Sequence, residues 1–323
     1  MSPPETDAIE EQAKKFKELR INDHVYELLK ESNPDLEVVF VHGLLRQGMN
    51  RRDAVWRTWK MRDSQVCWPE ILLPELLQIR TSQWDGNVNV TQYKPRVLSV
   101  AYENKPDLGP DGTGNGASDP YRIIENLIQD LIIDAGVGQR GVPVFFVGHD
   151  LGGILIKQFV LKVEDEAANA DTEAKKAKLN NFLDNLKSVF FFCTPHYGAE
   201  AFDNLVARLN RTDANQMLCL MQMLYNKTSR INMEFQTYRG GGPESRRSRF
   251  STHVFYATHE THEGGFDALV VPEGSARSDA DTFYAVNANH FTACQPETSA
   301  SSQVRAISHE MIKILKGREN IWW

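Results

Sequence analysis

The stretch from Val142 to Gly153 reads V-P-V-F-F-V-G-H-D-L-G-G. Its first half is β-branched and aromatic around Pro143, which is typical of a short strand buried on both faces. The second half is rich in glycine and predicts a tight turn. Apolar residues then recur at helical spacing, which predicts a helix after the turn: Ile154, Leu155, Phe159 and Val163.

The centre of this turn is Asp150, with Gly148 two residues before it and Gly152 two residues after it. Small residues are needed there because such a turn brings strand and helix too close for a Cβ atom. A strand, a turn of this kind and a helix are the context of a nucleophile elbow, G-x-S-x-G. The central side chain of an elbow stands above the sheet on a strained turn, and here it is aspartate instead of serine.

The composition limits the class of protein. A chain of 323 residues, 41% hydrophobic and 24% charged, can form one large α/β domain. Its net charge of −7 argues against nucleic acid or an anionic membrane as the main partner. No apolar run approaches the roughly 20 residues of a transmembrane helix, and the acidic N-terminus lacks the apolar core of a signal peptide.

Four cysteines lie far apart in the chain, without the spacing of metal ligands: Cys67, Cys193, Cys219 and Cys294. We interpret them as buried thiols in a reducing compartment and expect a cytoplasmic protein without a cofactor. His259 and His262 are three apart, whereas the zinc-protease helix needs a spacing of four, so no metal site is predicted.

Six apolar runs predict buried strands, separated by segments of helical character: 36–41, 96–102, 142–147, 187–193, 253–258 and 282–286. This alternation predicts the α/β class, with a mostly parallel central sheet and helices on both faces, in a single domain over residues 1–323. Asn22-Asp23 predicts a hairpin over 15–31. Residues 200–238 are predicted to be helical, either as a lid or as core packing. The segment after the predicted strand 36–41, which contains Trp56 and Trp59, is predicted to be a polar loop.

Three residues follow predicted strands in the order of an α/β-hydrolase triad: Asp150 as nucleophile, Glu260 as acid and His290 as base. Asp267 and Glu273 are rival acids, because the path of the intervening loop does not follow from the sequence.

The backbone N–H groups of Leu44 and Leu151 are expected to form the oxyanion hole. His42, Gly43 and His149 are expected to support this hole and the elbow.

These motifs resemble the SERAC-type lipase/esterase-like α/β hydrolases and their GPI inositol-deacylase relatives. The matching segments are V-V-F-V-H-G-L (38–44), R-V-L-S-V-A-Y (96–102), F-V-G-H-D-L-G-G (146–153), F-F-F-C-T-P-H-Y-G (190–198), V-V-P-E-G-S-A (270–276) and N-H-F-T-A-C-Q-P (289–296). The resemblance implies the α/β-hydrolase fold, esterase-like activity and a small-molecule or lipid-like substrate. Similar domains begin some plant and fungal NLR immune receptors, which implies self-association as an alternative role.

Asp150 departs from this family, which has serine at the elbow, and it leaves three readings open. A carboxylate that attacks an ester would give a mixed anhydride, with a poor driving force. Attack on a saturated carbon would give an alkyl ester that water could hydrolyse, as in haloalkane dehalogenases and epoxide hydrolases. Those families resemble G-H-D-W, whereas this chain has Leu151. In the third reading Asp150 forms an ion pair with His290 and the domain is a silent pseudoenzyme.

Overall fold

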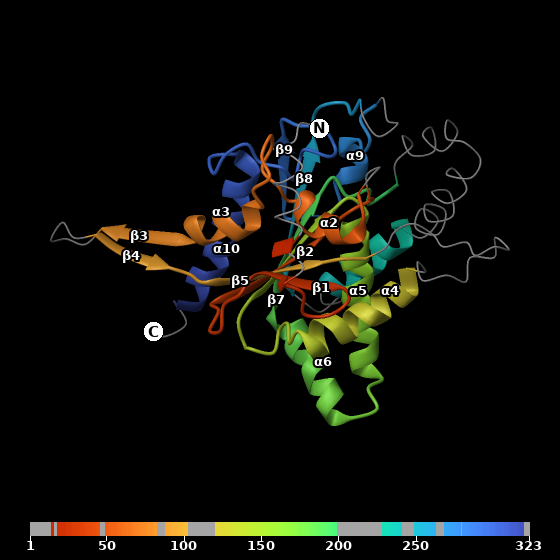
Figure 1. Cartoon of the computed structure of the whole chain (residues 1–323). Helices are drawn as coiled ribbons and strands as arrows, with labels where there is room; N and C mark the ends of the chain where they lie inside the picture. The colour runs from red at the N-terminus through yellow and green to blue at the C-terminus, as the bar shows by residue number, and fades with distance from the viewer. Residues whose placement is uncertain are drawn as a thin grey trace.

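A central seven-stranded sheet organises the protein (Figure 1). The computed structural model describes residues 14–15, 18–45, 49–82, 88–102, 120–198, 228–240, 249–262, 268–278 and 280–319. The strand order is β1-β5-β2-β6-β7-β8-β9, and only β1 runs antiparallel to its neighbour. The strands are β1 (Val25–Leu29), β5 (Pro95–Val100), β2 (Leu36–Val41), β6 (Val144–His149), β7 (Leu186–Phe192), β8 (Ser251–Ala257) and β9 (Thr282–Val286).

Alternating side chains along the strands feed two separate cores, one on each face of the sheet. In β6, Val144 and Phe146 pack against the helices of one face, and Phe145 and Val147 belong to the core of the other face. The first face carries α4 (Pro120–Leu127), the π-helix η1 (Ile128–Asp134), α5 (Leu151–Ala168) and α6 (Glu173–Asn185). The second carries α2 (Arg51–Arg57), α3 (Trp68–Leu76) and α10 (Ser302–Glu319). The predicted fold class is therefore confirmed.

The structure differs from the sequence prediction in the segment around the tryptophans. Trp56 and Trp59, predicted to lie in a polar loop, are fully buried. Trp56 belongs to α2, which begins after Asn50, whose side chain accepts hydrogen bonds from the N–H groups of Arg52 and Asp53.

A separate hairpin was not predicted at all. It consists of β3 (Gln78–Ser82) and β4 (Val88–Gln92), and it projects from the body of the molecule (Figure 1). Its polar, exposed sequence lacks the apolar run by which the other strands were predicted.

The N-terminal turn is shorter than the hairpin predicted over 15–31. Arg20 and Tyr26 form an antiparallel bridge across the turn at Asn22-Asp23, whereas Lys15 is helical. The side-chain oxygen of Asn22 closes the turn by accepting hydrogen bonds from the N–H groups of residues 24 and 25.

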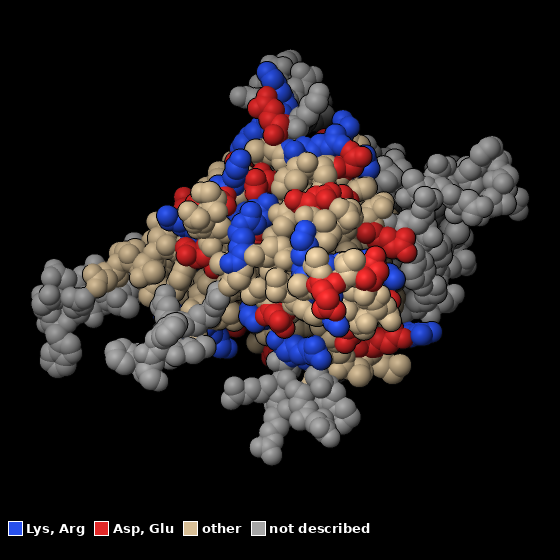
Figure 2. All heavy atoms as spheres, turned by 90° about the horizontal axis from the view of Figure 1, so that it is seen from below, with Lys and Arg blue, Asp and Glu red and all other residues tan. Residues whose placement is uncertain are grey.

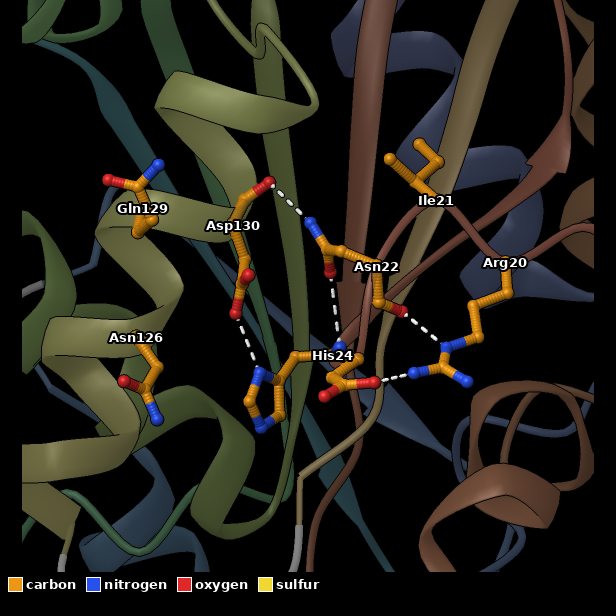
Figure 3. A pocket seen from close by; sticks show the side chains of 8 residues that line it. Arg20, Ile21, Asn22, His24, Asn126, Gln129 and Asp130 are labelled. Atoms are coloured by element: carbon orange, nitrogen blue, oxygen red, sulfur yellow. Dashed lines mark hydrogen bonds and ion pairs between the residues drawn. The ribbon is translucent and has the colours of Figure 1, made fainter.

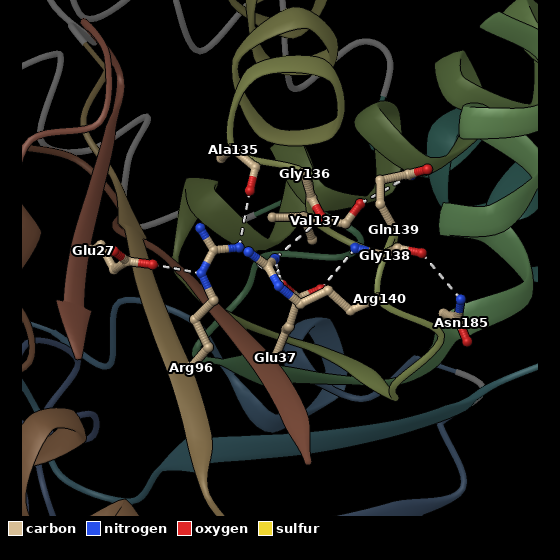
Figure 4. A network of polar contacts seen from close by, with 10 residues as sticks. All are labelled: Glu27, Glu37, Arg96, Ala135, Gly136, Val137, Gly138, Gln139, Arg140 and Asn185. Carbon is tan, nitrogen blue, oxygen red and sulfur yellow. Dashed lines mark hydrogen bonds and ion pairs between the residues drawn. The ribbon is translucent and has the colours of Figure 1, made fainter. Parts of the chain in front are cut away.

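A buried network of charges closes the amino-terminal edge of the sheet (Figure 4). Glu37 of β2 is fully buried and lies 2.9 Å from the Arg96 guanidinium and 2.8 Å from that of Arg140. Its second oxygen accepts the N–H of Gly138 at 2.7 Å. Arg96 also pairs with Glu27 of β1 at 2.5 Å, so the network ties β1, β2, β5 and the segment before β6 together.

We predict that Glu37→Gln lowers the free energy of unfolding by about 3 kcal/mol, because Arg96 stays buried and loses one of its two carboxylates. Urea unfolding followed by circular dichroism measures the change. Arg140→Gln is the matched control: the Arg140 side chain is 36% exposed, so its loss should cost less than about 1 kcal/mol. An equal decrease in the free energy of unfolding in the two variants would contradict the central role of Glu37 in the network.

Candidate functional site

The carboxyl ends of the parallel strands place the predicted site residues along one edge of the sheet, where open α/β sheets bind ligands. Leu44 follows β2, Asp150 follows β6, Glu260 follows β8 and His290 follows β9. Cys193, a buried residue directly after β7, lies at the same edge.

Asp150 forms the strained turn expected of an elbow. Its backbone has φ 51° and ψ −124°, a region that costs a residue with a side chain about 1–3 kcal/mol. Two hydrogen bonds fix the turn: its N–H donates to the carbonyl of Phe192 at 2.8 Å, and its carbonyl accepts the N–H of Gly153 at 3.1 Å. The side chain is 1% exposed.

Close backbone packing explains the glycines on both sides of the turn. A Cβ atom on Gly148 would lie 2.8 Å from the Cα of Gly153, so strand and helix do meet there as predicted. A Cβ on Gly152 would instead lie 2.2 Å from the carbonyl oxygen of Val41 and 2.3 Å from that of His42. Position 152 must therefore be glycine, because the backbone at the end of β2 packs directly against it. This packing holds the loop after β2, which contains Leu44, against the elbow.

The carboxylate of Asp150 lies at the N–H groups of Leu44 and Leu151. The N–H of Leu44 donates a hydrogen bond to Oδ2 at 3.0 Å, and the N–H of Leu151 also stabilises this carboxylate. These are the two groups that the sequence predicted as oxyanion donors. Both leucines pack with Ile154 and Ile231 in a small apolar cluster beside the carboxylate.

His42 and Tyr102 stabilise the backbone of the loop that contains Leu44. The imidazole of His42 donates from Nδ1 to the Gly43 carbonyl at 2.8 Å and stacks on the Tyr102 ring with centroids 4.2 Å apart. The Tyr102 hydroxyl donates to the His42 carbonyl at 2.5 Å. Burial lowers the pKa of His42 to about 4, so it is neutral at pH 7. Tyr102 was not predicted as a site residue, although its place at the end of the predicted strand 96–102 was a signal for it.

His290 lies opposite Asp150, as the predicted pair requires. Its Nε2 is 3.6 Å from Asp150 Oδ1, longer than a hydrogen bond, and Oδ1 accepts no hydrogen bond from any described residue. The ring of His149 donates from Nε2 to the His290 carbonyl at 2.9 Å and so holds the loop after β9 near the elbow.

The two facing groups have pKa values shifted in opposite directions. Burial lowers the pKa of His290 to about 3 and raises the pKa of Asp150, although the field of His149 and the two backbone N–H groups oppose the rise. Burial therefore favours a neutral imidazole beside a carboxyl group over the predicted ion pair.

The structure places Glu260, which was predicted as the acid of a triad, at the surface. The Glu260 side chain is 65% exposed and faces His262 at 3.8 Å, whereas His290 is buried. Glu273, in the short helix α9 (Glu273–Ala276), is also exposed and pairs with Arg277 at 3.0 Å. Local loop geometry turns both carboxylates to solvent. The third candidate, Asp267, lies outside the described residues.

A buried lysine that the sequence analysis missed lies on the elbow helix. Lys157 Nζ donates to His196 Nδ1 at 2.6 Å and to the amide oxygen of Asn232, between the rings of Phe191 and Phe235. It joins α5, the loop after β7 and the helix at 228–239. The described part of the predicted 200–238 helical segment thus packs into the core; residues 201–227 lie outside the described residues.

A surface hollow of about 600 Å³ lies between the N-terminal turn and η1 (Figure 3). His24 Nδ1 lies 2.6 Å from Asp130 Oδ2 there, and the Asn22 amide donates to the Asp130 carbonyl at 3.0 Å. These contacts fasten the turn to the π-helix. Acidic and basic side chains alternate over the face seen in Figure 2, without a basic stripe that would suit a nucleic acid.

The described residues contain no group of three or more His, Cys, Asp or Glu side chains that could hold a metal ion. No helix in this part of the chain is long and apolar enough to cross a membrane.

We predict that the protein loses stability steadily as the pH falls below about 6.5. Burial lowers the pKa of His290 to about 3 and those of His42 and His253 to about 4, so in this range the unfolded chain binds more protons. Each of these histidines then lowers the free energy of unfolding by about 1.4 kcal/mol for each pH unit. Burial also lowers the pKa of His196 well below its usual value. The raised pKa values of Asp150 and Glu164 act with the opposite sign, but they are two groups against four histidines.

Urea unfolding at a series of pH values between 7.5 and 4.5 measures this loss. His253→Gln should reduce the pH dependence of the free energy of unfolding by the equivalent of about one proton, because it removes one of these histidines. His253 lies away from Asp150, so the change leaves the candidate site intact. A free energy of unfolding that stays constant down to pH 5 would contradict the prediction.

The chain is similar in sequence to known proteins. The chain is 26% identical to protein SERAC1 of Mus musculus over 285 residues and 26% identical to that of Danio rerio over 269, in each case covering 81% of this chain and 36% of the relative. It thus spans about a third of the length of these relatives. No family model matches the chain.

Solved structures with a similar course of the chain are lipases, esterases and related hydrolases. The Saccharomyces cerevisiae peroxisomal α/β-hydrolase Lpx1 is 11% identical, with 90% of this chain and 81% of that one covered and a TM-score of 0.47. The Bacillus licheniformis lipase BlEst2 is 14% identical, with 89% and 93% covered and a TM-score of 0.36. The chain therefore has the predicted fold class, and its sequence resemblance to the SERAC type is confirmed.

Proposed function

We propose that this chain is a lipase/esterase-like α/β-hydrolase module whose acyl-transfer site is closed by its own aspartate. The observation that carries the proposal is the hydrogen bond from the Leu44 N–H to Asp150 Oδ2 at 3.0 Å. An esterase needs that N–H for the oxyanion of the tetrahedral intermediate. In this chain the nucleophile position itself fills the hole.

Three physical effects act against ester hydrolysis here. The carboxylate occupies donors that the substrate oxygen would need, and when it is ionised its charge repels an oxyanion. A carboxylate that attacks an ester also gives a mixed anhydride, which lies uphill of the ester. The rest of the machinery is kept: the strained turn at Asp150, the donors Leu44 and Leu151, and a neutral His290.

A module of this kind acts by binding. A lipid-like or other small molecule would contact Leu44, the partly buried member of an apolar cluster whose other residues, Leu151, Ile154 and Ile231, are buried. A role in signalling or receptor assembly, implied by the family resemblance, belongs to the same proposal, and so does a cytoplasmic location.

We predict that Asp150→Ser creates esterase activity that the wild type lacks. Serine carries a hydroxyl where aspartate carries the larger carboxylate, so the Leu44 N–H becomes available to a substrate oxygen and His290 can activate the hydroxyl. Hydrolysis of p-nitrophenyl butyrate should rise at least about 100-fold, the usual contribution of an oxyanion-hole donor. A fluorophosphonate probe should label the variant.

Two matched controls accompany this experiment. Asp150→Asn keeps the shape that fills the hole and should remain inactive. Adding His290→Ala to Asp150→Ser should abolish the new activity, and adding Asp267→Asn tests the remaining candidate acid. Ester hydrolysis by the wild type that is lost in Asp150→Asn would refute the proposal.

A second function is favoured by the other carboxylate oxygen. Asp150 Oδ1 is buried, accepts no hydrogen bond from the described residues and faces the Nε2 of His290, while Oδ2 is held by Leu44. Oδ1 could attack a saturated carbon, with the leaving group departing with its bonding electrons. His290 would then take a proton from a water molecule, which attacks the ester carbonyl carbon Cγ, and Oδ2 would carry the oxyanion beside the Leu44 N–H. The Cγ–Oδ1 bond would break as the oxyanion collapses, and the product would leave as an alcohol that carries Oδ1 and the proton returned by His290.

We predict for this second function that His290→Ala accumulates an alkyl ester on Asp150, because the ester forms but is not hydrolysed. Intact-protein mass after incubation with terminal epoxides and short haloalkanes detects the adduct. His290→Ala combined with Asp150→Asn is the control that should gain no mass. An unchanged mass in His290→Ala with every compound would leave only the binding module.

A further inference from the structure

We propose that the hairpin β3–β4 is a self-association element that pairs the outer edge of β4 with β4 of a second copy of this chain. The hairpin projects from the body and forms a two-stranded sheet of its own (Figure 1). A two-stranded ribbon is marginally stable in water, whereas a sheet of three or more strands is stable. Pairing two hairpins would make one four-stranded sheet.

Only the base of the hairpin is anchored in the core. Ile79 and Tyr93 are buried with the residues of the second face, and the Gln92 amide donates to the Pro74 carbonyl at 3.3 Å. Beyond this base, residues 89–92 of β4 are all exposed, and Val90 is 54% exposed. β4 thus carries an apolar β-branched side chain in water at the middle of an edge strand.

The hydrogen-bond pattern shows which backbone groups of β4 are turned outward. The N–H of Tyr93 donates to the Leu77 carbonyl at 2.9 Å, in the register that pairs Thr91 with Ile79 and Val90 with Arg80. Pairs in an antiparallel ladder alternate between hydrogen-bonded and non-hydrogen-bonded. Thr91 therefore faces β3, and the N–H and C=O groups of Val90 point away from it toward the free edge.

The charges along the two edges select β4 and a second copy of the chain as its partner. The β4 sequence V-N-V-T-Q carries no charge, so an antiparallel pair centred on Val90 sets Val90 opposite Val90 and Asn89 opposite Thr91. The same pairing along β3 would set Arg80 opposite Arg80. Charged residues on an edge prevent edge-to-edge pairing, and like charges directly opposite destabilise it. Only the β3 edge is protected in this way.

The geometry of the pair agrees with the shape of the molecule. An antiparallel pair about a two-fold axis at Val90 puts the roots of the two hairpins at opposite ends of the shared sheet. The two bodies therefore lie apart. One strand pair buries less than the roughly 1,200 Å² of a standard stable interface, so we expect weak, concentration-dependent dimers.

Sedimentation velocity over a wide concentration series tests the proposal with full-length protein. The wild type should pass from monomer to dimer, and Val90→Lys should raise the dissociation constant at least about tenfold, since two lysines then meet at the two-fold axis. Thr91→Lys is the matched control, with the same charge on the neighbouring residue, which lies opposite Asn89 of the partner. It should raise the constant clearly less than Val90→Lys. Unchanged melting temperatures verify that both variants fold.

Disulfide trapping tests the register independently. Val90→Cys should form a cross-linked dimer under mild oxidation, because residues that form a hydrogen-bonded antiparallel pair lie about 5.5 Å apart at Cα. Thr91→Cys should not, because the two Cα atoms would lie diagonally at about 7–8 Å. A wild type that is monomeric at every concentration, or equal cross-linking of the two variants, would overturn the proposal.

Discussion

The strained turn at Asp150 is the constraint on which the site depends. Gly152 lies against the last carbonyls of β2, so the end of β2 and the start of α5 are fixed to each other by backbone packing. The distance between the Leu44 N–H and the Asp150 side chain is therefore set by the main chain. Aspartate fits this backbone without changing it. Its side chain is longer than that of serine, so its carboxylate reaches the position that a substrate oxygen would take.

Buried polar groups are hydrogen-bonded at one edge of the sheet and partly unsatisfied at the other. At the amino-terminal edge, Glu37 and Arg96 satisfy each other in a network that joins several elements. At the carboxyl edge, Asp150 Oδ1 is buried without a hydrogen bond from the described residues, and burial keeps His290 neutral. A buried oxygen without a hydrogen bond lowers the free energy of unfolding, and proteins tolerate this loss mainly at functional sites. The satisfied network at the amino-terminal edge stabilises the same sheet.

The strands buried on both faces were the most predictable elements. The bounds predicted for β2, Leu36–Val41, agree with the structure, because a long apolar run follows from burial between two layers of helices. The bounds predicted for β9, Thr282–Val286, also agree, although β9 is an edge strand that is only partly buried. The hairpin β3–β4 has no such run, since most of its residues do not enter a core. Trp56 was predicted in a loop because the burial of its short helix depends on distant parts of the chain.

The sequence by itself determined the fold class, the elbow at residues 148–153 and the alignment of Leu44, Asp150 and His290 at one edge of the sheet. Those features follow from burial patterns and from the order of strands along the chain. Only the tertiary structure decided that Oδ2 lies under the Leu44 N–H and that Glu260 turns to solvent. These facts depend on differences of a few ångströms between segments 106 residues apart and on the path of a loop, neither of which leaves a periodic signal.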